Sequence, residues 1–346
     1  MIEFQQGNLL EADAEALVNT VNCVGVMGKG IALQFKQAYP ENFRRYERAC
    51  EAGEVRLGQM FVVPSGLLTN PRFIINFPTK QHWKAKSRLA DIRSGLSDLV
   101  EVVRSNDVQS IAVPPLGCGN GGLDWTEVFP LIETAFADLT EVRVLVYAPQ
   151  PAPVPAEMPV ATRRPKLTRA RSLFILLIAR YRAPGYRLTK LEVQKLAYFL
   201  QVAGEPLKLR YVKDKFGPYA DNLNHTLLDM EGHYIRGFGD RSSDSTIYPL
   251  PGAVEDARSV LTVDADALAR LERVSQLIEG FEDPYGMELL ASLMWVAKED
   301  ARAATDIDVA TDLLHAWNDR KRRTFSPDHA RKAWQRLQKM NWLDTP

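Results

Sequence analysis

The sequence predicts an α/β fold for about the first 150 residues and a mainly α-helical second half. Short apolar runs alternate with helix-like segments as far as residue 150, and this alternation is typical of a largely parallel sheet covered on both faces. A span with six prolines then interrupts regular structure, since proline is poorly tolerated in both helices and strands. Beyond it, long segments place apolar residues at helical spacing.

Six apolar runs in the first part are bounded by glycine, proline or asparagine, as strands commonly are. The predicted strands are Ile2–Gln5, Ala16–Val21, Gln59–Val63, Arg72–Phe77, Ser110–Val113 and Val142–Tyr147. The predicted helices are Gly30–Tyr39, Pro40–Ala52, Arg88–Ser105 and Trp125–Leu139. Because Ile92, Leu96, Leu99 and Val103 recur at helical spacing, we expect this stripe to face the core.

The proline-rich span sets the predicted domain boundaries: an α/β domain over residues 1–150, an extended linker over 151–166 and a mainly α domain over 167–346. In the last domain we expect a short strand over Lys208–Val212 and a turn at Phe216–Tyr219. Thr189 and Glu192 have the spacing of a capping box. The predicted helices are Leu173–Tyr181, Leu191–Ala203, Ala265–Glu279, Pro284–Ala301, Val309–Lys321 and Pro327–Met340.

Composition excludes several classes of protein. Among 346 residues, 43 basic and 43 acidic side chains cancel, so no bulk positive charge indicates nucleic-acid binding. Three cysteines without C-x-x-C spacing and five scattered histidines predict neither a disulfide framework nor a metal site. No basic-then-apolar leader opens the sequence and no apolar run is long enough to span a bilayer, so we expect a cytoplasmic protein. We expect no cofactor.

Charge is unevenly distributed in the second half. The stretch 254–312 has fourteen acidic and five basic residues, a net charge of −9, whereas 319–339 has two acidic and eight basic residues, a net charge of +6. Such runs are usually solvated helix faces. The alternative is an acidic surface for a basic partner, and composition does not distinguish the two.

A glycine-rich segment, Pro114–Trp125, follows a predicted strand and precedes a predicted helix. Its glycines at 117, 119 and 122 match the dinucleotide fingerprint G-x-G-x-x-G, but that motif belongs to the first strand–helix unit and here lies more than a hundred residues into the chain. A second such loop places Gly25, Gly28 and Gly30 before a helix. Glycines at strand-to-helix junctions let backbone N–H groups approach phosphates, so two such loops predict a site for a nucleotide diphosphate.

Several separated motifs together resemble macrodomains, an α/β fold that binds ADP-ribose. These motifs are Gly7-Asn8-Leu9, the pair Asn19 and Asn22, Met27–Ala32 and Pro115–Gly119. The segment Phe77-Pro78-Thr79-Lys80 is similar to the lysine-dependent branch of ADP-ribosyl glycohydrolases. With the linker and the α-rich second half, the whole chain resembles DarG-type antitoxins, which pair with toxins that ADP-ribosylate DNA. The second half resembles them mainly in architecture, although Leu191–Leu200 and Phe216–Tyr219 are also similar to antitoxin-associated domains.

The resemblance implies that Lys80 attacks, or lies against, the anomeric carbon of the distal ribose. This requires some neutral amine, hence a lowered pKa, to which Lys84 and Lys86 would contribute if they face the same way. The alternative is that Lys80 is an ordinary solvent-exposed lysine on a loop, without a catalytic role. The ligand-binding residues that the resemblance implies are Gly7, Asn8, Leu9, Asn19, Asn22, Gly28, Lys29, Gly30, Ile31, Gly117, Cys118, Gly119, Asn120, Gly121 and Gly122.

Two positions depart from the family pattern. Relatives carry an aspartate, which helps to resolve a lysine intermediate, where this chain has Gly121; Asp124 lies three residues further on and is better placed to cap the following helix. Lys80 could then act as an electrostatic or acid–base group without a stable adduct. At position 8, many macrodomains have aspartate to accept from the adenine amino group, and Asn8 keeps an acceptor oxygen without its charge.

Three further positions have alternative interpretations. Asn22 could hold the distal ribose hydroxyls or be a turn residue. Cys118 could be a nucleophile, but no histidine is tied to it by motif, and we favour a packing role. His82 and Trp83 could stack a base of single-stranded DNA, with Lys84, Lys86 and Arg88 along its phosphates; Trp83 could equally be a lid over the core.

The favoured hypothesis is an antitoxin whose first domain removes ADP-ribose from thymine in single-stranded DNA and whose second domain binds and inhibits the cognate toxin. The −9 stretch would then mimic DNA. Alternatives are a reader that binds ADP-ribose without cleaving it, and a hydrolase acting on ADP-ribosylated Glu or Asp of proteins. The dehydrogenase reading of the fingerprint is the least favoured.

Overall fold

The protein is described by a computed structural model that covers residues 1–149, 158–182, 185, 188–239 and 246–344. The chain divides into two compact units, one formed mainly by Met1–Arg164 and the other mainly by the residues that follow. No helix in the described ranges is long and apolar enough to cross a membrane.

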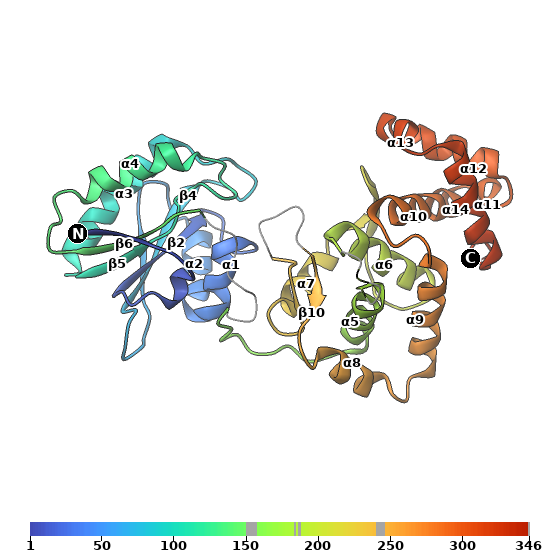
Figure 1. Cartoon of the computed structure of the whole chain (residues 1–346), viewed down its shortest axis with the longest axis horizontal. Coiled ribbons are helices and arrows are strands. Elements are labelled where there is room, and N and C mark those ends of the chain that lie inside the picture. The colour runs from blue at the N-terminus through green and yellow to red at the C-terminus, as the bar shows by residue number, and fades with distance from the viewer. Residues whose placement is uncertain (150–157, 183–184, 186–187, 240–245, 345–346) are drawn as a thin grey trace. The chain divides into compact units, whose positions relative to one another are not determined.

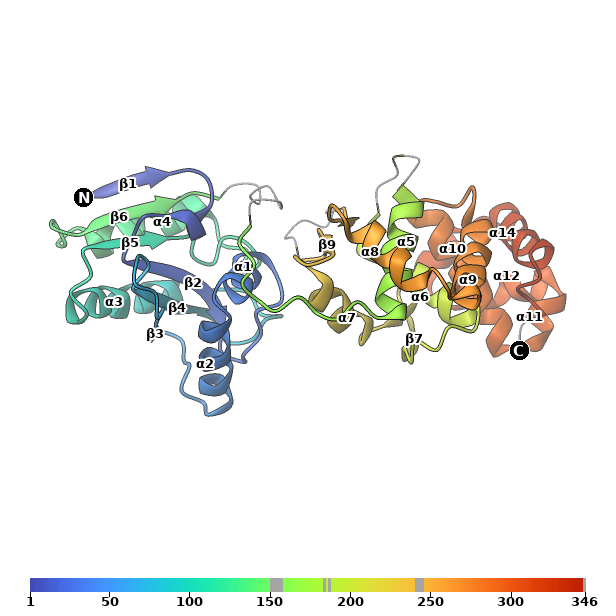
Figure 2. The ribbon, with the colours of Figure 1, turned by 90° about the horizontal axis from the view of Figure 1, so that it is seen from below.

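The first unit is built on a six-stranded sheet in the order β1-β6-β5-β2-β4-β3, in which β3 alone runs antiparallel to its neighbour β4 (Figure 2). The strands are β1 (Ile2–Gln5), β2 (Ala16–Asn22), β3 (Phe61–Pro64), β4 (Phe73–Lys80), β5 (Ser110–Val113) and β6 (Arg143–Tyr147). The helices are η1 (Leu9–Glu11), α1 (Gly30–Ala38), α2 (Pro40–Glu51), α3 (Leu89–Ser105) and α4 (Trp125–Phe136). Each predicted strand and helix of this part is confirmed, with ends shifted by three residues at most.

Helices cover both faces of the sheet (Figure 1). On one face, α3 and α4 bury the apolar side chains of the central strands, and the predicted stripe that includes Ile92 and Leu99 lies in this core. On the other face, η1, α1 and α2 complete two smaller cores around Phe35 and Tyr46. Because five neighbouring strands are parallel, all of their carboxyl ends lie at one edge of the sheet.

Only the second part of the predicted linker lies within the described residues. Residues 151–157 lie outside the described ranges, whereas the segment after them packs onto the first unit. Met158 is buried, and the Ala161 N–H donates to the Gln37 carbonyl at the distance of 2.8 Å. The end of the first unit at Arg164 is therefore set by packing as well as by proline content.

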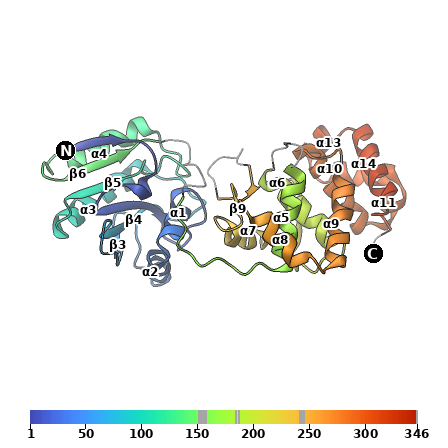
Figure 3. The same cartoon turned by 60° about the horizontal axis from the view of Figure 1, so that its bottom comes forward.

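The second unit is mainly helical, as predicted. Its core surrounds α5 and α6; α5 packs against α8 and α9, and α6 packs against α10 (Figure 3). The capping box is confirmed, because the Glu192 carboxylate accepts from the Thr189 N–H at 2.9 Å. The elements are α5 (Arg169–Arg182), α6 (Lys190–Val202), β7 (Tyr211–Asp214), β8 (Gly217–Ala220), α7 (Leu223–Met230), β9 (Ile235–Arg236), β10 (Tyr248–Pro249), α8 (Ala253–Leu261), α9 (Ala265–Ile278), α10 (Pro284–Glu299), α11 (Ala301–Thr305), α12 (Ile307–Ala316), α13 (Asp319–Thr324) and α14 (Pro327–Lys339).

Three predictions for this unit are wrong in detail. The predicted strand from Lys208 begins at Tyr211 instead, because Lys208 adopts φ +57°, outside the β region. The predicted turn at Phe216–Tyr219 is largely strand β8, which pairs antiparallel with β7. The predicted helix Val309–Lys321 is two helices, since Asn318 is extended and its side chain caps α13 through the Lys321 N–H at 2.8 Å.

Candidate active site

The motifs singled out in the sequence meet at the carboxyl edge of the parallel strands. Gly7 and Asn8 follow β1, and the glycine-rich segment follows β5. Asn22 and Lys80 end the neighbouring strands β2 and β4 and are paired in their register. The Cys23 N–H donates to the Gln81 carbonyl at 3.2 Å and continues this pairing beyond the strands. This edge is where open α/β sheets bind their ligands.

The Lys80 amine lies against the glycine-rich segment. Its Nζ donates to the carbonyls of Trp83 at 3.2 Å and Asn120 at 3.3 Å. Burial, together with repulsion from the Lys86 ammonium, lowers the pKa of Lys80. Of the two neighbouring lysines, Lys86 therefore supplies the expected repulsion, whereas Lys84 lies over the Trp83 ring with its Nζ 4.8 Å from the ring centroid.

The glycine-rich segment forms a cradle of backbone N–H groups. Gly117 and Gly122 have φ of +71° and +78°, values that favour glycine, and they fold the segment back on itself. Within the described part of the chain, no acceptor takes the N–H groups of Gly119, Asn120 or Gly121. Three consecutive free N–H groups are suited to an anion such as a diphosphate.

Position 121 requires glycine, because the Gly117 backbone and the Ser87 side chain approach it closely. A Cβ atom at this position would lie 2.2 Å from the Gly117 carbonyl oxygen and 2.3 Å from the Ser87 hydroxyl. The Ser87 N–H donates to the Gly121 carbonyl at 3.1 Å and holds the segment in this position. In this loop conformation, an aspartate cannot occupy position 121.

Asp124 caps helix α4, as its position predicted. Its carboxylate accepts from the Thr126 N–H at 2.9 Å and from the Thr126 hydroxyl at 2.7 Å. These hydrogen bonds lower the pKa of Asp124. The carboxylate is therefore engaged at the helix terminus.

The loop between β2 and α1 is organised by the Asn22 side chain. Its Oδ1 accepts from the Val24 N–H at 2.9 Å, and its Nδ2 donates to the Val26 carbonyl at 2.6 Å. The buried Tyr46 hydroxyl donates to the Asn22 carbonyl at 2.6 Å. Of the two interpretations of Asn22, the structure gives it the turn role; contact with a ribose stays a prediction.

The amino end of α1 faces the same edge as Asn22. Its N-cap residue, Lys29, is extended and forms no side-chain cap. The Gly30 N–H donates to the Gly239 carbonyl at 3.0 Å, whereas the N–H groups of Ile31 and Ala32 have no acceptor among the described residues. Lys29 is exposed, and Gly28 and Ile31 beside it are half-buried, whereas Gly30, the first helical residue, is buried. This contrast with the capped helix α4 makes α1 the better of the two helix ends for an anion.

Asn19 has no exposed surface for a ligand. Its side chain is 0 % exposed, and its Nδ2 donates to Asn76 Oδ1 at 3.0 Å. Asn76 Nδ2 donates in turn to Asn42 Oδ1 at 2.7 Å, which links β2 and β4 to α2. Asn19 also lies 3.8 Å from the Met27 sulfur. Asn19 therefore has a structural role: it connects β2 to β4 and to the β2–α1 loop.

Asn8 caps the short helix η1. Its Oδ1 accepts from the Leu10 N–H at 3.1 Å, and its Nδ2 donates to Glu11 Oε1 at 3.2 Å. Gly7, with φ +98°, is exposed, and Leu9 is buried in the core under η1. Of the three residues of this motif, Leu9 is therefore structural, whereas Gly7 and Asn8 remain accessible.

Cys118 packs against the core beneath α3 and α4, and its thiol lies 3.5 Å from the Leu116 carbonyl. This supports the packing interpretation. Among the described residues, no three side chains of His, Cys, Asp or Glu come together as a metal site.

An aromatic and basic rim follows Lys80. The His82 and Trp83 rings stack with centroids 5.3 Å apart, and the Trp83 side chain is 48 % exposed. Lys84, Lys86 and Arg88 are also exposed. About half of the indole surface is therefore open to a stacked base, and this role of Trp83 stays a prediction.

Sequence reasoning missed Ser87 and Tyr46. Ser87 is buried under the glycine-rich segment, and Tyr46 is buried beneath Asn22. Nothing in the local sequence marks either residue, since each acts on a segment more than twenty residues away. The only sequence feature that could have pointed to Tyr46 is the position of Asn22 at a strand end, followed by the amphipathic helix that contains Tyr46.

Comparison with known proteins gives consistent results. The Macro domain family model matches residues 18–132. The chain is 47% identical over 352 residues to the DNA ADP-ribosyl glycohydrolase of Thermus aquaticus, covering 100% of this chain and 97% of that protein. It is 34% identical over 165 residues to a DNA ADP-ribosyl transferase–DNA ADP-ribosyl glycohydrolase fusion protein of Thermosipho africanus, covering 43% of this chain and 42% of the fusion. Among solved structures, the macrodomain of Mycobacterium tuberculosis DarG is 59% identical, with 43% of this chain and 99% of that chain covered and a TM-score of 0.43.

Proposed function

This chain belongs to the family of DNA ADP-ribosyl glycohydrolases, and we propose on that premise that its macrodomain releases ADP-ribose from thymine in single-stranded DNA. One observation carries the proposal: a lysine amine with a lowered pKa lies against a cradle of free N–H groups. The amine supplies a reactive group, and the cradle suits the diphosphate next to the ribose that reacts.

The ligand is proposed to follow the carboxyl edge of the sheet. Its diphosphate would accept from the N–H groups of Gly119–Gly121 and from those of Ile31 and Ala32 in the first turn of α1. The adenine would lie near Asn8 and the distal ribose between Asn22 and Lys80, because these residues are at the ends of the same row of strands. In this arrangement the anomeric carbon faces the Lys80 amine.

The reaction is proposed to begin with the neutral Lys80 amine. Its lone pair forms a bond to the anomeric carbon, and the bond from that carbon to the thymine ring nitrogen breaks. The electron pair leaves on the thymine, which takes a proton from water. Water then adds to the anomeric carbon, releases Lys80 and completes hydrolysis. The N–H cradle would stabilise the diphosphate during both steps.

The absence of a carboxylate at position 121 leaves water activation without an evident side-chain base. If Lys80 acts through its charge instead, no adduct forms. Borohydride distinguishes the routes, since a lysine adduct that opens to an imine is reduced to a permanent bond and adds the mass of ADP-ribose to Lys80. If no adduct forms, borohydride treatment should leave the mass of the protein unchanged.

The rim after Lys80 is proposed to hold the DNA strand. A base would stack on Trp83, which by analogy with other single-strand binders contributes about 1–3 kcal/mol. The exposed lysines at 84 and 86 would contact phosphates on either side.

The substrate is tested by presenting the wild-type chain with two ADP-ribosylated materials. One is a single-stranded oligonucleotide modified on thymine, and the other is a protein modified on Glu or Asp. We expect ADP-ribose to be released from the oligonucleotide. Release from the modified protein alone would establish the protein hydrolase, and binding without release from either would establish the reader.

The second unit is proposed to bind and inhibit the cognate DNA-ADP-ribosylating toxin. Support comes from the Thermosipho relative, whose name joins a transferase and a glycohydrolase in one chain. Mimicry of DNA by the −9 stretch is less well supported than its sequence suggested, because at least seven of its fourteen acids form ion pairs. These are Asp264, Glu272, Glu279, Glu288, Glu299, Asp300 and Asp308. Glu255, Asp266 and Asp312 have no ion pair among the described residues, and replacing all three with Ala should weaken toxin binding and its salt dependence if mimicry operates.

A further inference from the structure

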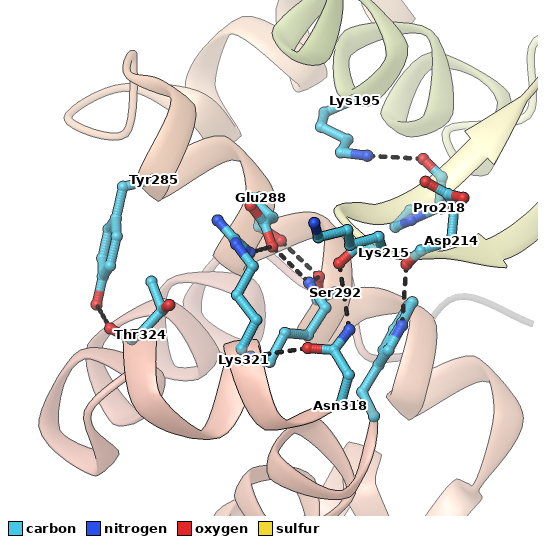
Figure 4. A network of polar contacts seen from close by, with 12 residues as sticks. Lys195, Asp214, Lys215, Pro218, Tyr285, Glu288, Ser292, Asn318, Lys321 and Thr324 are labelled. Carbon is cyan, nitrogen blue, oxygen red and sulfur yellow. Dashed lines mark hydrogen bonds and ion pairs between the residues drawn. The ribbon is translucent and has the colours of Figure 1, made fainter.

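The basic stretch that begins at Asp319 joins a distant hairpin to form one surface. Helix α13 starts beside the hairpin of β7 and β8, about a hundred residues earlier in the chain. Trp317 Nε1 donates to the Asp214 carbonyl at 3.0 Å, and Asn318 Nδ2 donates to the Lys215 carbonyl at 3.3 Å (Figure 4). These two bonds fix the first turn of α13 against the hairpin. We call the surface formed by Lys213, Lys215, Phe216, Arg320, Arg322 and Arg323 the hairpin patch.

Aromatic rings and cations alternate in this surface. The Phe216 side chain is 38 % exposed, and its ring centroid lies 4.6 Å from the Arg320 guanidinium and 5.2 Å from Lys215 Nζ. The Trp317 ring has Lys213 Nζ at 4.7 Å and Lys321 Nζ at 4.8 Å from its centroid. A flat apolar ring between cations matches the alternation of base and phosphate along a single strand.

The charge behind the patch is not balanced. Glu288 is 2 % exposed and accepts from Lys321 Nζ at 2.7 Å and from Arg320 at 2.6 Å. The Lys195 amine is also buried and donates to the Pro218 carbonyl at 2.8 Å rather than to a carboxylate (Figure 4). Arg320 and Lys321 thus share one buried carboxylate. An anion bound outside would offset the surplus.

Two pairs on the patch itself neutralise it weakly. Lys213 Nζ lies 3.8 Å from Glu299, and Arg322 lies 3.6 Å from Asp319, with all four side chains at least 44% exposed. Pairs of this kind contribute little and exchange readily for another anion. Lys215 and Arg323 have no carboxylate within ion-pairing distance among the described residues, although the Arg323 side chain donates to the Asp319 carbonyl.

We propose that the hairpin patch binds single-stranded DNA, with phosphates on its lysines and arginines and a base stacked on Phe216. The choice of DNA over RNA rests on the proposed function of the macrodomain. The binding itself rests on the alternating rings and cations and on the unbalanced charge behind them. An acidic segment of another protein would use the cations but would leave the Phe216 ring without a stacking partner.

The test uses the full chain and a fluorescein-labelled, unmodified oligonucleotide of thymine, with binding followed by anisotropy over a range of salt. The test variant reverses three exposed cations of the patch: Lys215→Glu, Arg322→Glu and Arg323→Glu. The control variant makes the same change in charge on α8 and α14: Arg258→Glu, Lys332→Glu and Lys339→Glu. A further variant, Phe216→Ala, removes the ring alone. Circular dichroism checks that each variant is folded.

Three phosphate contacts change the salt dependence of single-strand binding by about 0.7 each, so the slope of log K against log salt should fall by about 2 in the test variant. At about 0.1 M salt this corresponds to roughly 100-fold weaker binding. The control variant should stay within about threefold of wild type, and Phe216→Ala should lose about fivefold or more. The proposal is overturned if the test variant binds as wild type does, or if both variants lose equally.

The outcome is separable from that of the proposed function. ADP-ribosylated thymidine, a single nucleoside, is too short to reach from the macrodomain to a second binding surface, so the test variant should release ADP-ribose from it at the wild-type rate. If wild type fails to release ADP-ribose but binds the oligonucleotide through the patch, the proposed function fails and this inference stands. If the patch variant loses binding to the toxin alone, the surface is a protein interface and the inference is wrong.

Discussion

Replacement of Gly121 by alanine tests how the glycine-rich segment is held. The added Cβ would lie 2.2 Å from the Gly117 carbonyl oxygen and 2.3 Å from the Ser87 hydroxyl, where ordinary contacts begin near 3.4 Å. One side must move by more than about 1 Å, and overpacking of this kind costs about 1–3 kcal/mol. Gly121 has no positive φ, so the cost is steric rather than conformational.

The expected loss of about 2 kcal/mol would lower the melting temperature of the first unit by roughly 4–8 °C, measured by calorimetry on the full chain. Moving the segment also displaces the N–H cradle and the Asn120 carbonyl that accepts from Lys80. Loss of one hydrogen bond to a charged phosphate is worth about 1.5–3 kcal/mol, so the affinity for ADP-ribose should fall at least roughly tenfold.

The matched control is Gly28→Ala in the other glycine-rich loop. There the added Cβ would meet only Val26 Cγ1, at 3.7 Å, so stability should change by less than about 0.5 kcal/mol. If Gly121→Ala melted and bound ADP-ribose as wild type does, the close approach of Ser87 and Gly121 would not be what shapes the segment.

Three further predictions concern charged groups. If the neutral Lys80 amine reacts, the single-turnover rate should rise with pH, with a midpoint below the ordinary lysine pKa of 10.5. Lys86→Gln removes a repelling charge and should move the midpoint of this pH profile upward. An unchanged midpoint would show that Lys86 does not lower the pKa of Lys80. Burial and the neighbouring Lys321 lower the pKa of Lys195 to about 7, so between about pH 7 and 10 the unfolded chain holds a proton that the folded chain has lost, and stability should rise with pH across this window. Urea melts of Lys195→Met should show a flatter profile there, and a slope equal to that of wild type would refute this. Asp124→Ala should cost about 1 kcal/mol through loss of the α4 cap while leaving ADP-ribose release intact; loss of release would instead make Asp124 a catalytic residue.

The sequence predicted the first unit well because its signals are local. Strand ends marked by glycine, proline or asparagine were enough to place the strands, whereas the grouping of Lys80, Asn22 and the glycine-rich segment in one site was implied by the resemblance to macrodomains. The cap at Asp124 followed from position alone. What it could not predict depends on residues distant in the chain: Ser87 under Gly121, and Asn76 beside Asn19.

The second unit shows the same limit. The break between α12 and α13 occurs where Trp317 and Asn318 bond to a hairpin about a hundred residues away. The local sequence predicted a strand and a turn near that hairpin but not its contact with the break. The acidic stretch looked like an open charged surface because its partners, such as Arg180 and Arg336, lie outside it. Pairing across long sequence distances is set by packing rather than by local composition.

The central claim is that Lys80 cleaves ADP-ribose from thymine, and the most direct measurement is single-turnover release from a thymine-modified oligonucleotide by wild type and Lys80→Ala. Loss of a positioned reactive group lowers rates by roughly 10²–10⁴-fold, and we predict a fall in this range. Binding of free ADP-ribose should change by less than about tenfold, because the N–H cradle is retained. Release by Lys80→Ala at the wild-type rate would contradict the claim.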